Sequence, residues 1–256
     1  MQQTKRYFLS LSYKGTAYHG WQFQPNALAV QQVLDKALNV FFRFQVETIG
    51  CGRTDAGVHA TAFYAHVDLP NQVEIDQEKF LKAINSLLPD DIAVKQLIAV
   101  GNDAHARFDA ILRSYQYHIH FKKDPFKKDL SWLIKHKLDV EAMQKAASII
   151  KQYEDFGAFC KSNADNFTNI CNIQKSEWEE TTDSLIYHVS ANRFLRNMVR
   201  AIVGTLVDVG KNKIPPESMH QIIKSQNRSA AGASVPACGL FLTEVKYPYI
   251  NTINGR

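Results

Sequence analysis

In the first hundred residues, some stretches alternate hydrophobic and polar positions as a strand does, and others space the hydrophobic positions as a helix does. Alternating apolar positions over residues 6–13 predict a half-buried strand. Apolar positions at helical spacing predict an amphipathic helix over 28–42. Further patterns predict strands over 46–49 and 61–67, a helix over 76–87 stopped by Pro89, and a strand over 92–100. The order β-α-β-β-α-β is typical of a ferredoxin-like split unit.

A comparable order of elements returns later in the chain, with longer insertions. The patterns predict a strand over 114–121, a helix over 140–150, strands over 174–181 and 185–191, a helix over 194–209 and a last strand over 240–247. We therefore predict an α+β fold with two ferredoxin-like subdomains of mostly antiparallel sheet, spanning residues 1–106 and 107–248. The polar tail over 249–256 is expected to fray.

Composition places the chain among ordinary globular proteins. Its 256 residues are 45% apolar and 21% charged, which excludes disordered and collagen-like classes. No stretch approaches the roughly 18 apolar residues of a membrane span, so we expect no membrane association and a cytoplasmic protein. The four cysteines form no CxxC pair, which favours reduced thiols and argues against structural zinc.

The net charge of +5 is unevenly distributed. Residues 1–106 hold 9 Lys and Arg against 10 Asp and Glu, whereas residues 107–256 hold 21 against 15. Six lysines lie within 121–138, interleaved with Phe126 and Trp132. Arg193, Arg196 and Arg200 form a second cluster. Each group alone fits a solvated face, while both together with aromatics suggest a nucleic-acid partner.

The stretch 50–60 is the strongest candidate for chemistry. Three glycines within eight residues, Gly50, Gly52 and Gly57, let the backbone turn sharply, and Asp55 lies among them, two residues after Arg53. The same pattern also fits a plain hairpin connection in which Asp55 makes an Asx turn and Arg53 faces solvent. Spacing alone leaves both interpretations open.

Residues 52–60, Gly-Arg-Thr-Asp-Ala-Gly-Val-His-Ala, resemble the catalytic motif of the tRNA pseudouridine synthase A family. Other segments agree in order: residues 13–16 and 20–22, 30–31, 106–110 with 113–117, 194–200 with 203–204, and 236–240 with 245–248. Ala29 stands where the family commonly has Thr before the first helix, so we look to Asn26 for the N-cap. Residues 170–173 lack the Arg-Thr pair often found there, which puts one RNA contact in doubt.

The resemblance implies isomerisation of uridine to pseudouridine at positions 38–40 of tRNA, by a homodimer that needs neither cofactor nor metal. It also implies that the two subdomains meet at a central basic cleft containing Asp55. There Asp55 is the nucleophile, on either the sugar or the base. Burial under RNA raises the pKa of a carboxyl group and so disfavours its ionised form. An adjacent guanidinium lowers that pKa again and keeps the carboxylate charged.

The resemblance assigns that guanidinium to Arg196. The alternative is that Arg196 is an ordinary exposed arginine that contacts phosphate or nothing. The expected helix sets Arg196 and Arg200 one turn apart on the flank of its apolar stripe, and for Arg200 a functional and a structural role are equally open. Tyr115 is implied to stack on the flipped base, although strand periodicity alone assigns it to the core. Arg53 either holds the nucleotide out or contacts phosphate. Leu240 is implied to contact substrate.

Two other classes of function stay open. A non-catalytic RNA-binding module would suit the charge and the aromatics equally well. A metal-dependent hydrolase could use Asp55 and His59, although Gly57 argues against a helix that would align them, and full activity in excess chelator would exclude it. His118 and His120 are interpreted as exposed strand histidines rather than metal ligands. Cys51 fits a small buried residue better than a nucleophile.

Overall fold

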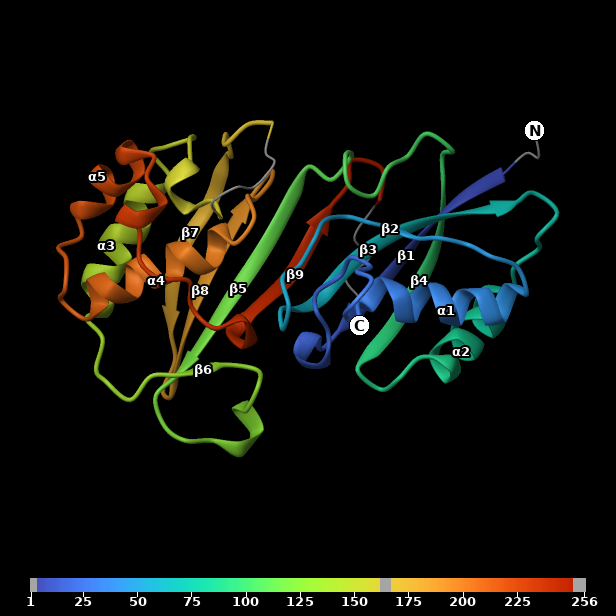
Figure 1. Ribbon diagram of the computed structural model, residues 1–256, viewed down its shortest axis with the longest axis horizontal. Helices are drawn as coiled ribbons and strands as arrows, with labels where there is room; N and C mark the ends of the chain where they lie inside the picture. The colour runs from blue at the N-terminus through green and yellow to red at the C-terminus, as the bar shows by residue number, and fades with distance from the viewer. Residues whose placement is uncertain (1–3, 162–166, 251–256) are drawn as a thin grey trace. The chain divides into compact units, whose positions relative to one another are not determined.

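A computed structural model describes residues 4–161 and 167–250 (Figure 1). The chain forms two compact units, which divide at Ile111/Leu112 and again at Phe241/Leu242. Unit 1 holds the residues up to Ile111 and those from Leu242 onward, and unit 2 holds Leu112–Phe241. The division therefore differs from the predicted ranges 1–106 and 107–248: the first boundary lies at Ile111/Leu112, and most of the carboxyl-terminal strand belongs to the first unit.

Unit 1 is built on long antiparallel strands. β1 (Thr4–Tyr13) lies between β3 (His59–Pro70) and β4 (Ile92–Val100), and β2 (Ile49–Gly50) pairs with β3. β9 (Leu240–Lys246) follows β3 in the order β4-β1-β3-β9. The helices α1 (Val30–Phe42) and α2 (Gln77–Leu87) pack against each other through aromatic rings. The order β-α-β-β-α-β is confirmed, but the predicted strand over 46–49 is wrong, since only Ile49 of that stretch is in a strand.

The first helix begins two residues later than predicted, at Val30. Neither Ala29, at the N-cap position, nor Asn26 caps it with a side chain within the described contacts. The backbone carbonyls of Gly20 and Trp21 instead accept the N–H groups of Val30 and Gln31, at 3.1 and 2.9 Å. Tertiary packing of the preceding segment therefore replaces the missing threonine cap.

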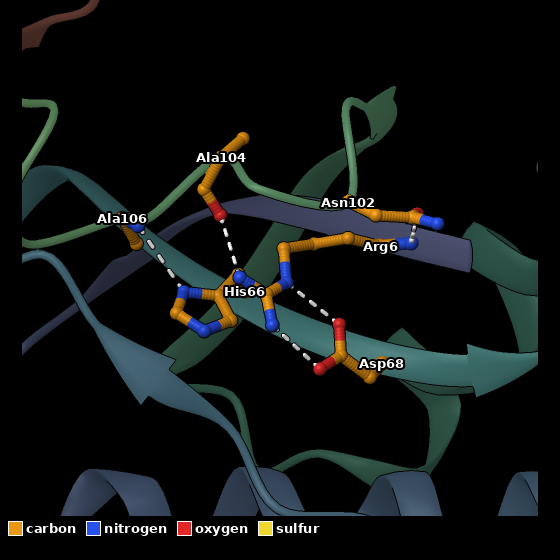
Figure 2. Close-up of polar contacts among 6 residues, drawn as sticks. All are labelled: Arg6, His66, Asp68, Asn102, Ala104 and Ala106. Atoms are coloured by element: carbon orange, nitrogen blue, oxygen red, sulfur yellow. Dashed lines mark hydrogen bonds and ion pairs between the residues drawn. The ribbon is translucent and has the colours of Figure 1, made fainter. Parts of the chain in front are cut away.

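The segment after β4 is fastened to the strands of unit 1 by a polar cluster (Figure 2). Arg6 forms a two-pronged ion pair with Asp68, with both N–O distances at 2.7 Å, and donates to the carbonyl of Ala104 at 2.9 Å. His66 accepts the N–H of Ala106 through Nδ1 at 3.1 Å. Burial lowers the pKa of His66 to about 4, so the ring is neutral at physiological pH and keeps this acceptor.

The carboxyl-terminal segment closes over the same region of unit 1. The Tyr247 hydroxyl donates to the carbonyl of Ala106 at 2.6 Å, and the Tyr249 hydroxyl donates to Asp109 at 2.7 Å. The expected fraying at 249 is therefore wrong for Tyr249, because its hydroxyl finds an acceptor. Residues 251–256 of the predicted tail lie outside the described residues.

Unit 2 has an antiparallel sheet covered by helices. β8 (Ser184–Ala191) lies between β5 (Leu112–His120) and β7 (Ile173–Glu180), and the short β6 (Trp132–Leu133) runs parallel to β5. Figure 1 shows the helices α3 (Val140–Ile150), α4 (Met198–Gly210) and α5 (Ser218–Ser225) gathered beside these strands. The described residues thus form an α+β protein with mostly antiparallel strands, as predicted.

Three details of unit 2 differ from what the sequence predicts. The helix predicted from residue 194 begins at Met198, because Asn197 adopts a left-handed conformation (φ 66°) and turns the chain. Neither β6 nor α5 was predicted. His120 is buried rather than exposed, and burial lowers its pKa. None of the four cysteines is in a disulfide with another cysteine of the described residues. Within the described ranges, no helix combines the length and apolar character needed to cross a membrane.

Candidate active site

Asp55 lies in the loop that connects β2 to β3 in unit 1. The Val58 N–H donates to the Asp55 carbonyl at 3.2 Å and closes a tight turn, in which Gly57 has a φ of 78°. Asp55 is half-buried and Arg53 is exposed. The turn therefore holds the Asp55 carboxylate at a partly solvated position, while the arginine two residues earlier extends into solvent.

A distant segment supports this loop from behind. Gly15, in a short 3-10 turn (Gly15–Ala17), lies directly against the Val58 carbonyl, and Gly20 (φ 88°) lies against the Thr54 carbonyl. The Gly57 N–H donates to the Tyr18 carbonyl at 3.1 Å. These contacts explain why glycines are needed: a Cβ at either Gly15 or Gly20 would overlap a backbone oxygen of the Asp55 loop.

Buried polar side chains complete the attachment. The hydroxyls of Tyr13 and Thr54 are hydrogen-bonded at 2.9 Å, and the Gly15 N–H donates to Nδ1 of His59 at 2.9 Å. Both contacts are buried, where a lost hydrogen bond is costly. His59 thus has a structural role, because its Nδ1 accepts a hydrogen bond from the segment that supports the loop. The sequence alone did not reveal this role.

Trp21 is a second contributor that sequence reasoning missed. Its ring stacks on Phe63 of β3 at 4.2 Å between centroids and lies against Gly50, immediately before the loop. Tyr13 packs on the same Phe63 ring at 5.5 Å. Tyr13, Gly15, Gly20 and Trp21 all belong to the segments that resembled the family, so that resemblance was the available signal.

We expect Gly15→Ala to destabilise unit 1 by about 1–3 kcal/mol and to reduce turnover, because the new methyl group meets a backbone carbonyl that cannot rotate away. Urea unfolding and single-turnover rates measure the two effects. Gly101→Ala is the matched control in the same unit, since its methyl group would meet only the end of the exposed Asp103 side chain. Equal stability of the two variants would contradict this account of the loop.

Arg196 and Arg200 lie in unit 2 in different local settings. Arg196 precedes α4 and is exposed, so the prediction that both lie one turn apart on a helix is wrong. Arg200 lies in the first turn of α4, where its Nε donates to the Val235 carbonyl at 2.8 Å. Arg200 therefore fastens the segment before Pro236, whereas Arg196 presents its side chain to solvent.

Tyr115 and Leu240 differ in exposure. On β5, Tyr117 and Ile119 are fully buried, but Tyr115 is half-buried and its ring meets Phe194 edge-on at 5.1 Å. The strand face that the periodicity assigned to the core is thus buried at Tyr117 and Ile119 and becomes partly exposed at Tyr115. Leu240, the first residue of β9, is only 5% exposed.

The Asp55 loop itself offers the carboxylate of Asp55 and the exposed guanidinium of Arg53. In the described part of the chain, no three His, Cys, Asp or Glu side chains gather in a way that could hold a metal ion. His118 makes a 3.1 Å contact between its Nε2 and Gln116, its neighbour on the same strand face. Asp55, half-buried on a turn closed by the Val58 N–H, is the carboxylate that we take as the candidate nucleophile.

Comparison with known proteins identifies the family of this chain. The sequence profile of the tRNA pseudouridine synthase family matches residues 10–109 and 152–248, which include Asp55, Arg53, Arg196, Arg200 and Leu240. The chain belongs to this family of isomerases. The resemblance drawn from residues 52–60 is thereby confirmed.

Curated relatives are more specific. The tRNA pseudouridine synthase A of Bacteroides fragilis is 47% identical over 245 residues, which cover 95% of this chain and 97% of that protein. The protein of the same name from Bacteroides thetaiotaomicron is 47% identical, covering 95% and 91%, and that from Bacillus subtilis is 37% identical, covering 93% and 97%. The chain is thus similar to tRNA pseudouridine synthase A along nearly its whole length.

Proposed function

We propose that this protein isomerises uridine to pseudouridine at positions 38–40 in the anticodon arm of tRNA. The observation that carries the proposal is Asp55, half-buried on a tight turn whose backbone is fixed by Gly15, Gly20 and Tyr18. The reaction breaks the bond between the sugar C1′ and the base N1, rotates the base, and forms a bond from C1′ to C5. C5 then loses its proton and N1 gains one, so that atoms and electrons balance. A positioned carboxylate can act as the nucleophile without a redox partner.

In this proposal one of the other residues keeps the Asp55 carboxylate ionised, and the rest bind the target nucleotide. The exposed Arg196 pairs with Asp55 and keeps it charged when RNA excludes water. Tyr115 stacks on the flipped uridine, and Arg53 holds the nucleotide outside the helix. Leu240 and Arg200 border the bound nucleotide, with Arg200 acting through the segment that it fastens.

We further propose that two ferredoxin-like subdomains meet at a basic cleft and that the enzyme works as a cytoplasmic homodimer. The charge distribution supports the first point, since the basic excess lies after residue 106 and the Asp55 loop before it. The negative phosphates of tRNA are the expected counterpart of that excess. The names of the curated relatives support tRNA as the substrate.

The test is a map of pseudouridine in tRNA from cells with and without this protein. We expect pseudouridine at positions 38–40 to disappear in its absence and to return when the gene is restored. A gene carrying Asp55→Asn is the matched control and should not restore it. An unchanged anticodon arm would refute the proposed function.

A further inference from the structure

The connection between β5 and β6 in unit 2 exposes a phenylalanine to an unusual degree. Phe126 lies in a 3-10 turn (Pro125–Lys127) and is 90% exposed. Trp132, the other aromatic residue of the same basic run, packs edge-on against Tyr117 at 6.4 Å and lies under Lys211 at 5.8 Å. The two aromatics therefore differ: Trp132 supports the loop, and Phe126 presents a free ring to solvent.

The turn that carries the exposed ring is fixed by hydrogen bonds and by a proline. Asp124 accepts the Phe126 N–H at 2.9 Å and caps the turn, and Pro125 at its start restricts the backbone. Lys127 donates to the Ser184 hydroxyl at 2.8 Å, which ties the turn to the first residue of β8. Much of the entropy that a flexible loop would lose on binding is therefore already lost before a partner arrives.

The charge around the ring selects the kind of partner. Lys122 is neutralised by Asp183 at 2.9 Å. Lys123 and Lys128 are exposed, and neither forms an ion pair within the part of the chain that the structure describes. An exposed lysine thus precedes and another follows the ring along the chain, which fits a partner that offers negative charges beside a flat apolar surface. A second copy of this loop would bring lysines against lysines, which argues against self-association here.

We propose that residues 122–128 form an RNA-contact site outside the catalytic centre, in which Phe126 stacks on an unpaired base of the tRNA and Lys123 and Lys128 contact adjacent phosphates. Aromatic rings flanked by cationic side chains recognise single-stranded nucleotides in this way. The proposal rests on tRNA being the substrate. It adds a second nucleotide contact, separate from the flipped uridine.

The test compares binding of an unmodified tRNA transcript by filter binding at several salt concentrations. We expect Phe126→Ala to weaken binding about 5- to 150-fold at fixed salt, the range observed for loss of one stacked base. The dependence of log K on log salt should stay unchanged, because no charge is removed. Phe126→Trp should bind as tightly as wild type, since its ring also stacks.

The lysine variants separate charge from stacking. Lys123→Ala and Lys128→Ala should each reduce the salt slope by about 1, since each removes one phosphate contact. Lys224→Ala is the matched control, because it removes an exposed lysine of unit 2 that lies on α5. It should leave both the affinity and the slope as in wild type.

Two results would overturn the inference. One is wild-type affinity in Phe126→Ala while the wild-type protein binds tRNA well, which would leave the proposed function intact. The other is loss of affinity in Phe126→Ala together with a change in sedimentation, which would make the ring a contact between copies. Failure of the wild-type protein itself to bind tRNA would instead refute the proposed function, so the two failures are distinguishable.

Discussion

An Asp55→Asn protein is expected to bind tRNA with wild-type affinity and to form pseudouridine at least about 10⁴-fold more slowly in single turnover. The amide has nearly the shape of the carboxylate but cannot attack as an anion. The turn beneath it depends on the backbone contacts of Val58 and Gly57, which the substitution leaves in place. The loss should therefore be confined to the chemical step.

The control for this variant is Asp90→Asn, which removes an exposed carboxylate from the same unit. It should retain wild-type turnover. A rate for Asp55→Asn within tenfold of wild type would remove Asp55 from the nucleophile's role and would favour an RNA-binding module without catalysis. Urea unfolding of both variants shows whether either change disturbs unit 1.

We expect Arg196→Ala to lower the single-turnover rate by about 10²–10³-fold while changing the dissociation constant for tRNA less than about threefold. The Arg196 side chain is exposed, so we expect its removal to cost little stability. A guanidinium that pairs with Asp55 in the complex acts on the reactive carboxylate. A contact with phosphate would act on binding instead.

Arg196→Lys separates these roles further. It keeps the charge but loses the two-pronged geometry, so we expect an intermediate rate with unchanged binding. Lys224→Ala again serves as the control for removing one positive charge from unit 2. Equal losses of rate and affinity in Arg196→Ala would show that the residue contacts phosphate.

The sequence predicted those elements whose signals are local. The helix over 140–150 was placed correctly at both ends, and Asp139 caps it by accepting the Ala142 N–H at 2.9 Å. The start of α4 was wrong, because the apolar pattern continues through residue 194 while Asn197 turns the backbone out of the helix. Periodicity reports which face is buried and does not report such a turn.

The candidate site shows the same division between local and tertiary information. The residues around Asp55, and the family that they resemble, were enough to predict that this loop is the candidate site. Sequence alone could not show that Gly15 and Gly20 press against the carbonyls of Val58 and Thr54, since these contacts join segments some 35 to 45 residues apart. Nor could the pattern distinguish Phe126 from Trp132, because exposure depends on what packs around each ring.

The return of β9 to the first unit has a consequence for the order of synthesis. Unit 2 is one uninterrupted piece of chain, complete once Phe241 has been made, whereas unit 1 waits for the residues from Leu242 onward. Only then can the Lys246 carbonyl accept the Ile111 N–H, and only then can Tyr247 reach Ala106. Domains on the ribosome generally fold from the amino terminus. Here the half that holds Asp55 is translated first and finished last.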